Sequence, residues 1–332
     1  MNPRRCILES LRIVIISPTV REVDTAAVRP WWPSSFGRPL DRLADSIKSL
    51  GLIRPLIVLA DGAAFKLVCG RLRLAVLAGL ERGTVPARVL PPETSAAQAL
   101  EIALADNYER GWNQAELALL WKFLSENLPG EEALRLSSYL DLAKSPKIRA
   151  WALAAAGLPE KGLTALADGG LDLESAARLA VWEPESRGAL LDIFEALAPS
   201  KQKKRQWLDW LEDIARREKV SPADVLKSKE IQAALADGGG SGKSAAEDAA
   251  RHYLWRRRHP QLSELTAGRR EQVKALGLPK NLKLEADPTF EDLKFSLSMT
   301  FASHDELEAL GRKVAGLADD PAMIAMLKEG SQ

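Results

Sequence analysis

The spacing of apolar residues changes character near residue 92. Between residues 11 and 90, short runs rich in β-branched residues alternate with helical segments. The runs that suit strands are 11–16, 56–59, 65–68 and 85–90, because apolar stretches of this length and composition are typical of strands. Apolar residues recur at helical spacing from Leu40 to Leu50, and Gly51 follows where a left-handed residue typically ends a helix. The pattern predicts a compact module of mixed α and β structure.

From residue 94 to about residue 279 the pattern is almost entirely helical. Segments rich in Ala and Leu are separated by helix-stopping sequences at 128–130, 157–159, 169–170 and 183–184, each of which contains Pro or Gly. Short helices joined by tight turns are therefore expected. Trp207 and Trp210 stand at positions i and i+3 on an amphipathic face, so we expect them in the core rather than on a stacking surface.

Residues 238–244 read GGGSGKS and interrupt the helical pattern. The segment resembles a phosphate-binding loop, but Asp237 stands where that motif requires its first glycine. A flexible linker is the expected structure. It leads to a smaller unit, in which 282–286 and 294–301 suit strands and 305–317 suits a helix.

The second of these C-terminal strands carries one apolar face. Its side chains alternate, so that four apolar residues share a side: Phe295, Leu297, Met299 and Phe301. The helix 305–317 could cover this face. A unit of roughly fifty residues can hardly bury it alone, because small domains bury too little surface. A second copy of the chain is the simplest cover, and we expect a homodimer.

The predicted fold class is α+β, with a small mixed N-terminal module, an all-α middle domain and a small α+β C-terminal unit. The expected boundaries are 1–92 for the mixed module, 93–130 for helices that complete its site, 131–237 for the helical domain, 238–245 for the linker and 246–332 for the C-terminal unit with its basic helix.

Charge is balanced overall but separated along the chain. The net charge is +1, yet residues 1–90 carry fourteen Lys and Arg against seven Asp and Glu, and residues 251–283 carry nine against two. Such separation favours a polyanionic partner or self-association. Two distant cysteines and three histidines cannot supply a disulfide framework or a structural zinc site. Without an apolar run of about 18 residues or a signal peptide, we expect a cytoplasmic protein with no membrane partner.

Three segments within the first 118 residues suggest a specific relationship. They read LADSIKSLGLIRPLIV (43–58), KLVCGRLRLAVLAGLERGTVPARV (66–89) and ADNYERGWNQAELA (105–118). Together, and in this order, they resemble the ParB/RepB partition-protein family, which includes Spo0J-type proteins. The family's usual second box reads Gly-Glu-Arg-Arg, whereas residues 69–73 read CGRLR, which is closer to the form in plasmid-type relatives. The resemblance covers about residues 11–182.

Gly70 lies between a predicted strand and a predicted helix. We expect an anion pocket there, formed by the backbone N–H groups at the start of that helix together with Arg71 and Arg73. The resemblance implies that the anion is CTP, bound with Mg²⁺ by Asp106 and Asn107. The implied cofactor residues are Gly51, Arg54, Cys69, Gly70, Arg71, Arg73, Asp106, Asn107 and Arg110. The alternative is that both arginines are solvated and that Asp106-Asn107 is a plain helix end.

Residues 137–182 resemble the family's helix-turn-helix region. The turn is expected at 143–146, between a helix that ends near residue 142 and a second helix over about 147–156. The start of the second helix would then contact DNA, through Lys144, Ser145, Lys147 and Arg149. A plain helical bundle is the alternative. Further along, a basic run could contact DNA phosphates through Arg256, Arg257 and Arg258. The alternative is that these arginines form only a solvated face.

The resemblance implies a nucleotide-gated clamp on double-stranded DNA, used in plasmid or chromosome partition with a ParA-type ATPase; weak CTP hydrolysis stays open. One alternative is an enzyme on the same fold, a nuclease or a sulfiredoxin-like phosphotransferase with Cys69 near the phosphates. No histidine lies near Cys69 in the sequence. Another is a transcription regulator. Trp31-Trp32, in a Pro-rich insertion, suits either an exposed loop that binds a partner or a plug packed on the module.

Overall fold

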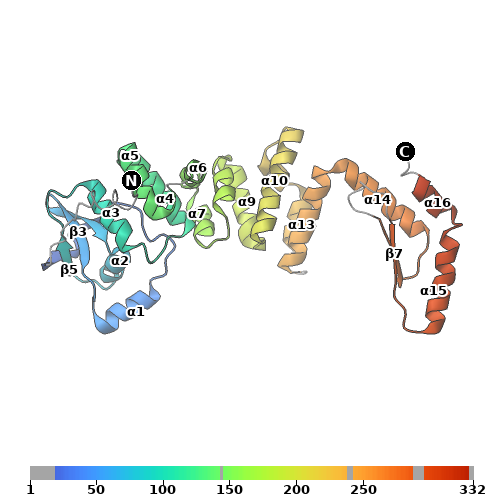
Figure 1. Cartoon of the computed structure of the whole chain (residues 1–332), viewed down its shortest axis with the longest axis horizontal. Helices are drawn as coiled ribbons and strands as arrows, with labels where there is room; N and C mark the ends of the chain where they lie inside the picture. The colour runs from blue at the N-terminus through green and yellow to red at the C-terminus, as the bar shows by residue number, and fades with distance from the viewer. Residues whose placement is uncertain (1–18, 143–144, 238–241, 287–294, 329–332) are drawn as a thin grey trace, which may run out of the picture.

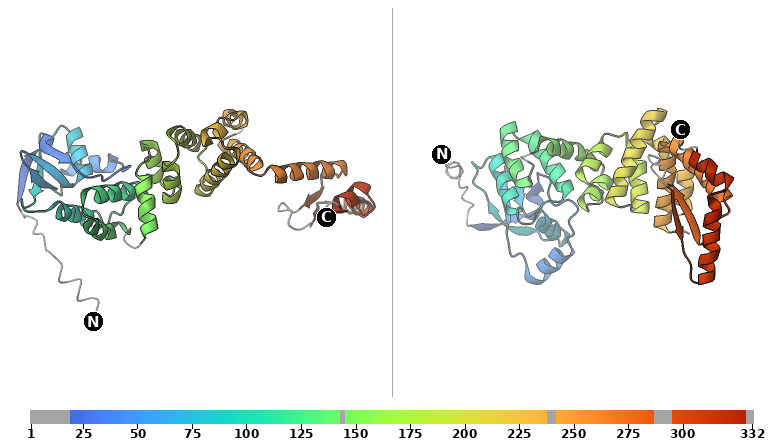
Figure 2. Two further views of the ribbon diagram at one scale, coloured as in Figure 1. Left: turned by 90° about the horizontal axis from the view of Figure 1, so that it is seen from above. Right: turned by 45° about the vertical axis from the view of Figure 1, so that its right-hand side comes forward.

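The computed structural model describes residues 19–142, 145–237, 242–286 and 295–328. Figure 1 shows an elongated arrangement, with a sheet-bearing module at one end, a row of helices in the middle and a small hairpin with its helices at the other end. Figure 2 shows the same order of parts from two further directions. This architecture confirms the predicted fold class. The predicted strand 11–16, Lys294 and residues 238–241 of the predicted linker lie outside the described residues.

Five strands form a mixed sheet in the N-terminal module. They are β1 (Val20–Asp24), β2 (Val28–Pro30), β3 (Leu56–Asp61), β4 (Ala64–Cys69) and β5 (Thr84–Val89), in the order β1-β5-β3-β4-β2. The β1–β5 and β3–β4 pairs are antiparallel, whereas the β3–β5 and β2–β4 pairs are parallel. The three central strands are those that the apolar runs predict. The two edge strands escaped prediction because each buries a single residue, Val23 or Val28.

Helices lie on both faces of this sheet. Side chains of α1 (Asp41–Leu50) and α2 (Arg71–Gly79) share a buried cluster with Leu67 of β4. The next residue on that strand, Val68, joins a different cluster that contains α3 (Ala96–Asp106). Because successive side chains of a strand point to opposite faces, α1 and α2 cover one face and α3 the other. Gly51 ends α1 with a φ of 72°, as predicted.

The loop over residues 31–40 links the sheet to the helical middle. Trp32 is buried, and its Nε1 donates a hydrogen bond to the Val68 carbonyl at 3.1 Å. The Trp31 ring meets Phe123 of α4 (Gln114–Asn127) edge-on, with 6.0 Å between ring centroids. A Cβ on Gly37 would lie 3.1 Å from the Cβ of Ala167, the last residue of α7 (Glu160–Ala167). The tryptophan pair is therefore packed against the protein.

The middle is a series of helices that end where the sequence predicts. Thus α4 ends just before Leu128, and α9 (Pro184–Leu197) begins at its proline. Trp207 is fully buried, as expected. No helix in the described ranges is both long and apolar enough to cross a membrane. The remaining helices up to the glycine-rich segment are α5 (Gly130–Leu136), the 3-10 turn η2 (Ser137–Leu140), α6 (Pro146–Ala155), α8 (Leu173–Ala180), α10 (Lys201–Glu218), α11 (Pro222–Leu226) and α12 (Lys229–Asp237).

Helix α13 (Lys243–Arg258) belongs to the core of the middle, although it follows the glycine-rich segment. Ala246, Ala250 and Leu254 are buried in the same cluster as side chains of α9 and α10. Their spacing of four residues places them on one stripe of the helix, which packs against α10. The helical middle therefore continues to about residue 258, and α13 begins inside the segment 238–245 that was expected to be a linker.

The C-terminal unit contains α14 (Pro260–Ala275), the antiparallel strands β6 (Leu282–Ala286) and β7 (Phe295–Met299), α15 (His304–Leu317) and α16 (Pro321–Lys328). Its small core is formed by Leu276, Leu284, Leu317 and Met326. Leu297, Met299 and Phe301 remain 36%, 41% and 48% exposed. Within one chain, α15 therefore leaves most of the apolar strand face uncovered.

Candidate functional site

A cavity of about 170 Å³ opens beside the start of α2. Four parts of the chain form its wall: the loop 31–40, α1 through Leu43, the turn between β4 and α2 with the first residues of α2, and the end of α3 with the turn that follows. Six of the nine predicted cofactor residues line it, all from the second and third sequence segments, and the first segment contributes Leu43. The lining residues are Trp32, Ser34, Ser35, Leu43, Gly70, Arg71, Leu72, Arg73, Asp106, Asn107 and Arg110.

Gly70 occupies a position that only glycine tolerates. Its φ is 105°, and a Cβ there would lie 2.6 Å from Leu56 Cδ2. Helix α2 starts at the next residue, and no side chain caps it. The first N–H groups of the helix therefore lack partners within the helix. Together with the positive end of the helix dipole, they favour an anion at this end of the cavity.

The two arginines of α2 differ in how they are held. Arg73 Nη1 donates to the carbonyls of Arg54 and Pro55, both at 2.8 Å, and its Nη2 lies 4.0 Å from Asp106 Oδ2. Arg71 is exposed, and its Nη1 donates to the Trp32 carbonyl at 3.3 Å. Arg73 thus ties α2 to the segment between α1 and β3, whereas Arg71 lies at the surface where an incoming anion would meet it.

Arg110 connects the cavity to α4. Its Nε donates to Asn107 Oδ1 at 3.1 Å, and its Nη1 donates to Glu116 Oε1 at 2.9 Å. Asn107 is itself held by a hydrogen bond from its Nδ2 to the Ala103 carbonyl at 2.7 Å. The Nη2 of Arg110 is buried without a hydrogen-bond partner. Because a buried donor without a partner is costly, this atom suits an oxygen of a ligand.

Glu116 forms ion pairs with two arginines from different parts of the chain, one in the loop 31–40 and one in the turn after α3. Its buried carboxylate accepts from Arg38 Nη2 at 2.7 Å, from Arg110 Nη1 at 2.9 Å and from the backbone N–H of Asn113 at 3.1 Å. Burial alone raises the pKa of Glu116, but the hydrogen bonds from Arg38 and Arg110 outweigh it and hold the pKa below its usual value. One carboxylate thus ties the loop 31–40 and the turn after α3 to the start of α4.

Cys69 precedes the cavity turn but does not line the cavity. It is buried, and desolvation together with the neighbouring Asp106 carboxylate raises the pKa of its thiol far above the usual value. The thiolate that nucleophilic chemistry requires is therefore not populated near neutral pH. Gly51 and Arg54 also lie outside the lining: Gly51 ends α1, and the carbonyl of Arg54 accepts from Arg73.

Sequence reasoning missed the contribution of the loop 31–40 and of Glu116. Trp32, Ser34 and Ser35 all line the cavity, and Ser35 has a φ of 63°, a strained conformation for serine. The Pro-bounded segment RPWWPSSFGRP was the available signal. For Glu116 the signal was the Asn-x-x-Glu pattern, a capping box that starts α4. That pattern predicts the helix start but not the two arginines.

Among the described residues, no three His, Cys, Asp or Glu side chains come together in a cluster that could hold a metal. Asp106 and Asn107 alone could therefore supply only part of a coordination shell. Such a pair fits Mg²⁺, which usually keeps several waters and takes phosphate oxygens as ligands.

The N-terminal module matches a known family. Residues 17–108 match the ParB N-terminal domain. This range contains the sheet, α1 to α3 and every cavity-lining residue except Arg110. The chain carries a ParB N-terminal domain.

The relatives of this chain are named as partition proteins. The chromosome-partitioning protein Spo0J of Thermus thermophilus is 37% identical over 152 residues, which are 45% of this chain and 53% of that protein. A probable plasmid-partitioning protein ParB of the same organism is 38% identical over 118 residues, or 33% and 38% of the two chains. A probable chromosome-partitioning protein ParB of Campylobacter jejuni is 33% identical over 111 residues, or 32% and 39%. The chain thus spans about half or less of the length of these relatives.

Two solved structures of ParB from Caulobacter crescentus resemble the chain distantly. One is complexed with CTP-gamma-S, with 24% identity, a TM-score of 0.26 and coverage of 52% of this chain and 97% of that chain. The other is complexed to the centromeric parS site, with 22% identity, a TM-score of 0.30 and coverage of 55% and 96%.

Outside the ParB domain, α6 stands where the helix-turn-helix resemblance predicts its second helix. Ser145 caps it by accepting a hydrogen bond from the Ile148 N–H at 3.3 Å, and Pro146 occupies its first position. Lys147 is exposed, and its ammonium lies 4.6 Å from the Trp151 ring centroid. The start of α6 therefore presents one exposed cation, while Lys144 lies outside the described residues.

Arg149 points back toward the turn instead. Its Nη1 donates to the Leu142 carbonyl at 2.9 Å, and its guanidinium lies 5.8 Å from the Trp121 ring centroid. These contacts connect α6 to the turn before it and to α4. The observed role of Arg149 is to hold α6 in place.

The basic run at the end of α13 is largely engaged within the protein. Arg257 pairs with Glu218 at 2.7 Å, and Arg258 pairs with Asp213 at 2.6 Å. Both partners belong to α10, so these ion pairs join α13 to α10. Arg256 is exposed. Arg256 is thus free to contact solvent, whereas Arg257 and Arg258 form ion pairs that hold α13 against α10.

Proposed function

We propose that this chain is a nucleotide-gated DNA-binding partition protein, in which the ParB domain binds CTP with Mg²⁺ and α6 binds double-stranded DNA. The observation that carries the proposal is the cavity at the start of α2, where an uncapped helix N-terminus, Arg71 and Asp106 come together. The partition role named for the relatives supports it.

The size of the cavity favours binding of the phosphate groups. At about 170 Å³ it is smaller than the roughly 300–1,000 Å³ typical of sites that enclose a whole small molecule. The triphosphate would lie against the first turn of α2, beside Arg71 and the unpartnered Nη2 of Arg110. Mg²⁺ would lie at Asp106 and Asn107 and neutralise part of the phosphate charge. The choice of CTP follows from the resemblance to the family.

Arg110 supports the gating part of the proposal. It lines the cavity and also bonds to Glu116, the buried carboxylate at the start of α4. A phosphate oxygen at Arg110 would weaken the hold of that arginine on Glu116, because a second anion competes for the same guanidinium. Nucleotide binding would thereby change the attachment of the ParB domain to the helical middle, and so to α6.

DNA binding is assigned to the start of α6, with Ser145 and Lys147 at the surface and Arg149 as the residue that holds the helix. Arg256 would add a contact to a phosphate. Two further assignments complete the proposal: a homodimer joined through the C-terminal unit, and a ParA-type ATPase as partner in the cytoplasm. The exposed side chains of β7 support the first, and the partition relatives support the second.

A sulfiredoxin-like phosphotransferase is disfavoured because the Cys69 thiol is buried and stays protonated. A transcription regulator would use the same nucleotide and DNA sites. Inheritance of a test plasmid distinguishes the two, because only a partition protein changes plasmid loss without changing transcription.

Calorimetric titration of the full chain tests nucleotide binding. CTP, ATP and GTP are titrated with Mg²⁺, with and without a DNA fragment that the chain selects from a random pool. We expect CTP to bind best, and Arg71→Ala to weaken it by at least about tenfold, since a charged hydrogen bond contributes about 1.5–3 kcal/mol. Arg82→Ala, which removes an exposed arginine of the same domain outside the cavity, is the control and keeps wild-type affinity.

Absence of heat with CTP, both alone and with DNA, would refute a nucleotide site. Equal affinity for the three nucleotides would retain a phosphate site but overturn the assignment of CTP. Equal loss in Arg71→Ala and Arg82→Ala would show that the affinity reflects overall charge rather than this cavity.

A further inference from the structure

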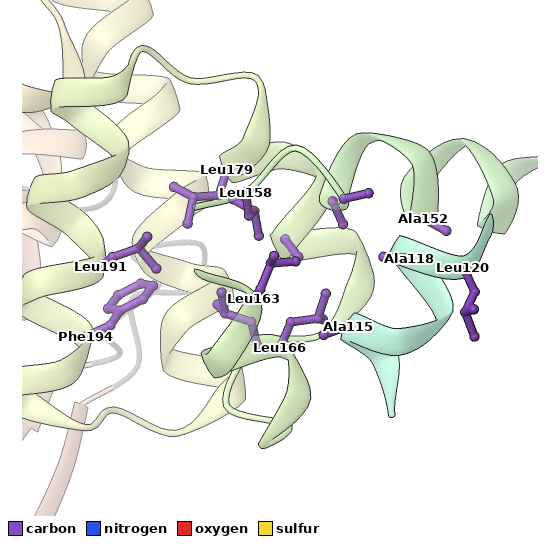
Figure 3. Close-up of a cluster of buried hydrophobic side chains, with 14 of the residues drawn as sticks. Ala115, Ala118, Leu120, Ala152, Leu158, Leu163, Leu166, Leu179, Leu191 and Phe194 are labelled. Carbon is purple, nitrogen blue, oxygen red and sulfur yellow. The ribbon is translucent and has the colours of Figure 1, made fainter. Parts of the chain in front are cut away.

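A second and larger cavity lies in the helical middle, where α7, α9 and α10 meet. Its volume is about 730 Å³, within the range of sites that hold small molecules. Leu191 and Phe194 of α9 give it an apolar wall. Figure 3 shows these two side chains projecting from α9 toward the leucines of α7. No residue of this cavity belongs to the ParB domain or to the start of α6.

A buried cation lines this apolar space. Lys204 is only 8% exposed, and its Nζ donates to the Gly170 carbonyl at 2.9 Å. The same ammonium lies 5.5 Å from the centroid of the Phe194 ring. Burial lowers the pKa of Lys204, and the nearby charge of Lys201 lowers it further. In the part of the chain that the structure describes, no Asp or Glu forms an ion pair with Lys204.

The surroundings of Lys204 lack the counter-charge that a buried lysine usually has. Lysine is almost never fully buried unless it is paired, because burial of a charge is costly without a counter-charge. An ammonium has three N–H donors, and the Gly170 carbonyl takes one of them. Donors therefore remain for a carboxylate, which would supply both the missing counter-charge and the hydrogen bonds.

The acidic residues at the rim do not reverse this preference. Glu160, Asp168 and Glu195 are all exposed, and Glu195 pairs with Lys161 at 2.5 Å. Charges in contact with water are strongly screened, whereas a buried charge acts through a medium of low dielectric constant. The attraction of an incoming anion to Lys204 therefore exceeds its repulsion by the rim.

We propose that this cavity binds a small amphipathic carboxylic acid. Its carboxylate pairs with Lys204, and its apolar body lies on Leu191 and Phe194. The site is separate from the cavity beside α2, so this proposal stands or falls independently of nucleotide and DNA binding. It gives the helical middle a ligand site of its own, between the helices that follow α6 and those that continue toward the C-terminal unit.

Octanoate and 1-octanol make a matched pair of probes, because they share an eight-carbon chain and only octanoate carries a charge. Each is titrated calorimetrically into the full wild-type chain. We expect saturable binding of octanoate and affinity for 1-octanol that is at least about tenfold weaker, since charge-assisted hydrogen bonds are roughly twice as strong as neutral ones. The comparison uses the unaltered chain, so it does not depend on the folding of a variant.

Two variants locate the site. Lys204→Met keeps a long apolar side chain without the charge, and we expect it to bind octanoate and 1-octanol equally. Lys201→Met removes the neighbouring lysine, which does not line the cavity, and should keep the wild-type preference. Circular dichroism and thermal unfolding check that both variants fold.

Three results would overturn the proposal. These are no saturable binding of octanoate to the wild-type chain, equal binding of octanoate and 1-octanol to that chain, and an undiminished preference for octanoate in folded Lys204→Met. Wild-type nucleotide affinity in Lys204→Met would show that a lost preference does not come from damage to the ParB domain.

Discussion

Glu116 is the residue whose charge most clearly couples two parts of the molecule. Its side chain is fully buried, whereas Arg38 and Arg110 keep 26% and 24% of their side-chain surface exposed. Removal of one member of a buried ion pair leaves its partners uncompensated and typically costs about 3–5 kcal/mol. The partial exposure of both arginines reduces this cost, because water screens the charges that remain.

Glu116→Gln should lower the free energy of unfolding by about 2–3 kcal/mol near pH 7. Because the pKa of Glu116 is lowered by folding, the ionised carboxylate stabilises the fold above about pH 4.3, the usual pKa of glutamate. This contribution is lost as the pH falls through the lowered pKa. Urea unfolding from about pH 7 to about pH 3 should therefore show the difference between variant and wild type shrinking on the acid side.

Glu109→Gln is the matched control, because Glu109 is exposed one residue before Arg110. It should leave stability within about 0.5 kcal/mol of wild type at every pH. A difference for Glu116→Gln that stays constant down to the acid limit would contradict the ion-pair account and indicate a packing effect.

At the scale of elements, α6 is held by its neighbours on one side and exposed at its start. Ser145 and Pro146 define where it begins, and Arg149 bonds back to the carbonyl of Leu142. Ala152 and Ala155 are buried, which allows close packing against α4 and α8. Under the proposed function, a helix anchored in this way presents Lys147 to DNA from a fixed position.

Lys147→Ala should weaken binding to DNA selected by the chain by about 1–3 kcal/mol if Lys147 reads a base edge. Loss of a phosphate contact would instead weaken selected and random DNA about equally and reduce the salt dependence. Fluorescence anisotropy with both DNAs at several salt concentrations distinguishes the two cases. Lys122→Ala, at a partly exposed position of α4, is the control with an equal change of charge. Unchanged affinity in Lys147→Ala would move the DNA-binding surface away from α6.

At the scale of the whole molecule, the chain ends in a unit that is incomplete by itself. Its core contains four buried apolar side chains, while β7 leaves a row of apolar side chains exposed. Helix α14 begins at Pro260, directly after α13, so the C-terminal unit starts near residue 260 rather than at residue 246. Figure 1 shows it at the far end from the ParB domain, where a second copy can meet it.

Sedimentation equilibrium of the full chain should therefore give the mass of a dimer. Met299→Asp places a charge on the apolar face and should shift the chain toward monomer, because burial of an unpaired charge at an interface is unfavourable. Ser298→Asp makes the same charge change on the neighbouring residue, whose side chain points to the other face of the strand, and should remain dimeric. A monomeric wild-type chain, or equal dissociation of both variants, would exclude β7 as the interface.

The sequence by itself determined the local structure. The breaks at Leu128, Gly157 and Pro184 are where helices end or begin, because Pro and Gly act on the backbone wherever they occur. The apolar runs also determined the three central strands, because a strand that is covered on both faces of its sheet carries a nearly continuous run of apolar residues. The place of Gly70 between a strand and a helix was also predictable from the sequence. In the structure its φ is positive, as glycine allows.

Only the tertiary structure decided which of these residues work together. The sequence places both Arg71 and Arg149 at binding sites, for a phosphate and for DNA, yet Arg149 turns back onto Leu142 while Arg71 lies at a cavity. The loop 31–40 and Glu116 are far apart in the chain, and they meet because α4 packs against the ParB domain. Helix α13 follows a glycine-rich segment, but its stripe of Ala and Leu is buried in the helical middle. Such outcomes depend on which surfaces are buried together, and burial is a property of the assembled fold that no local pattern contains.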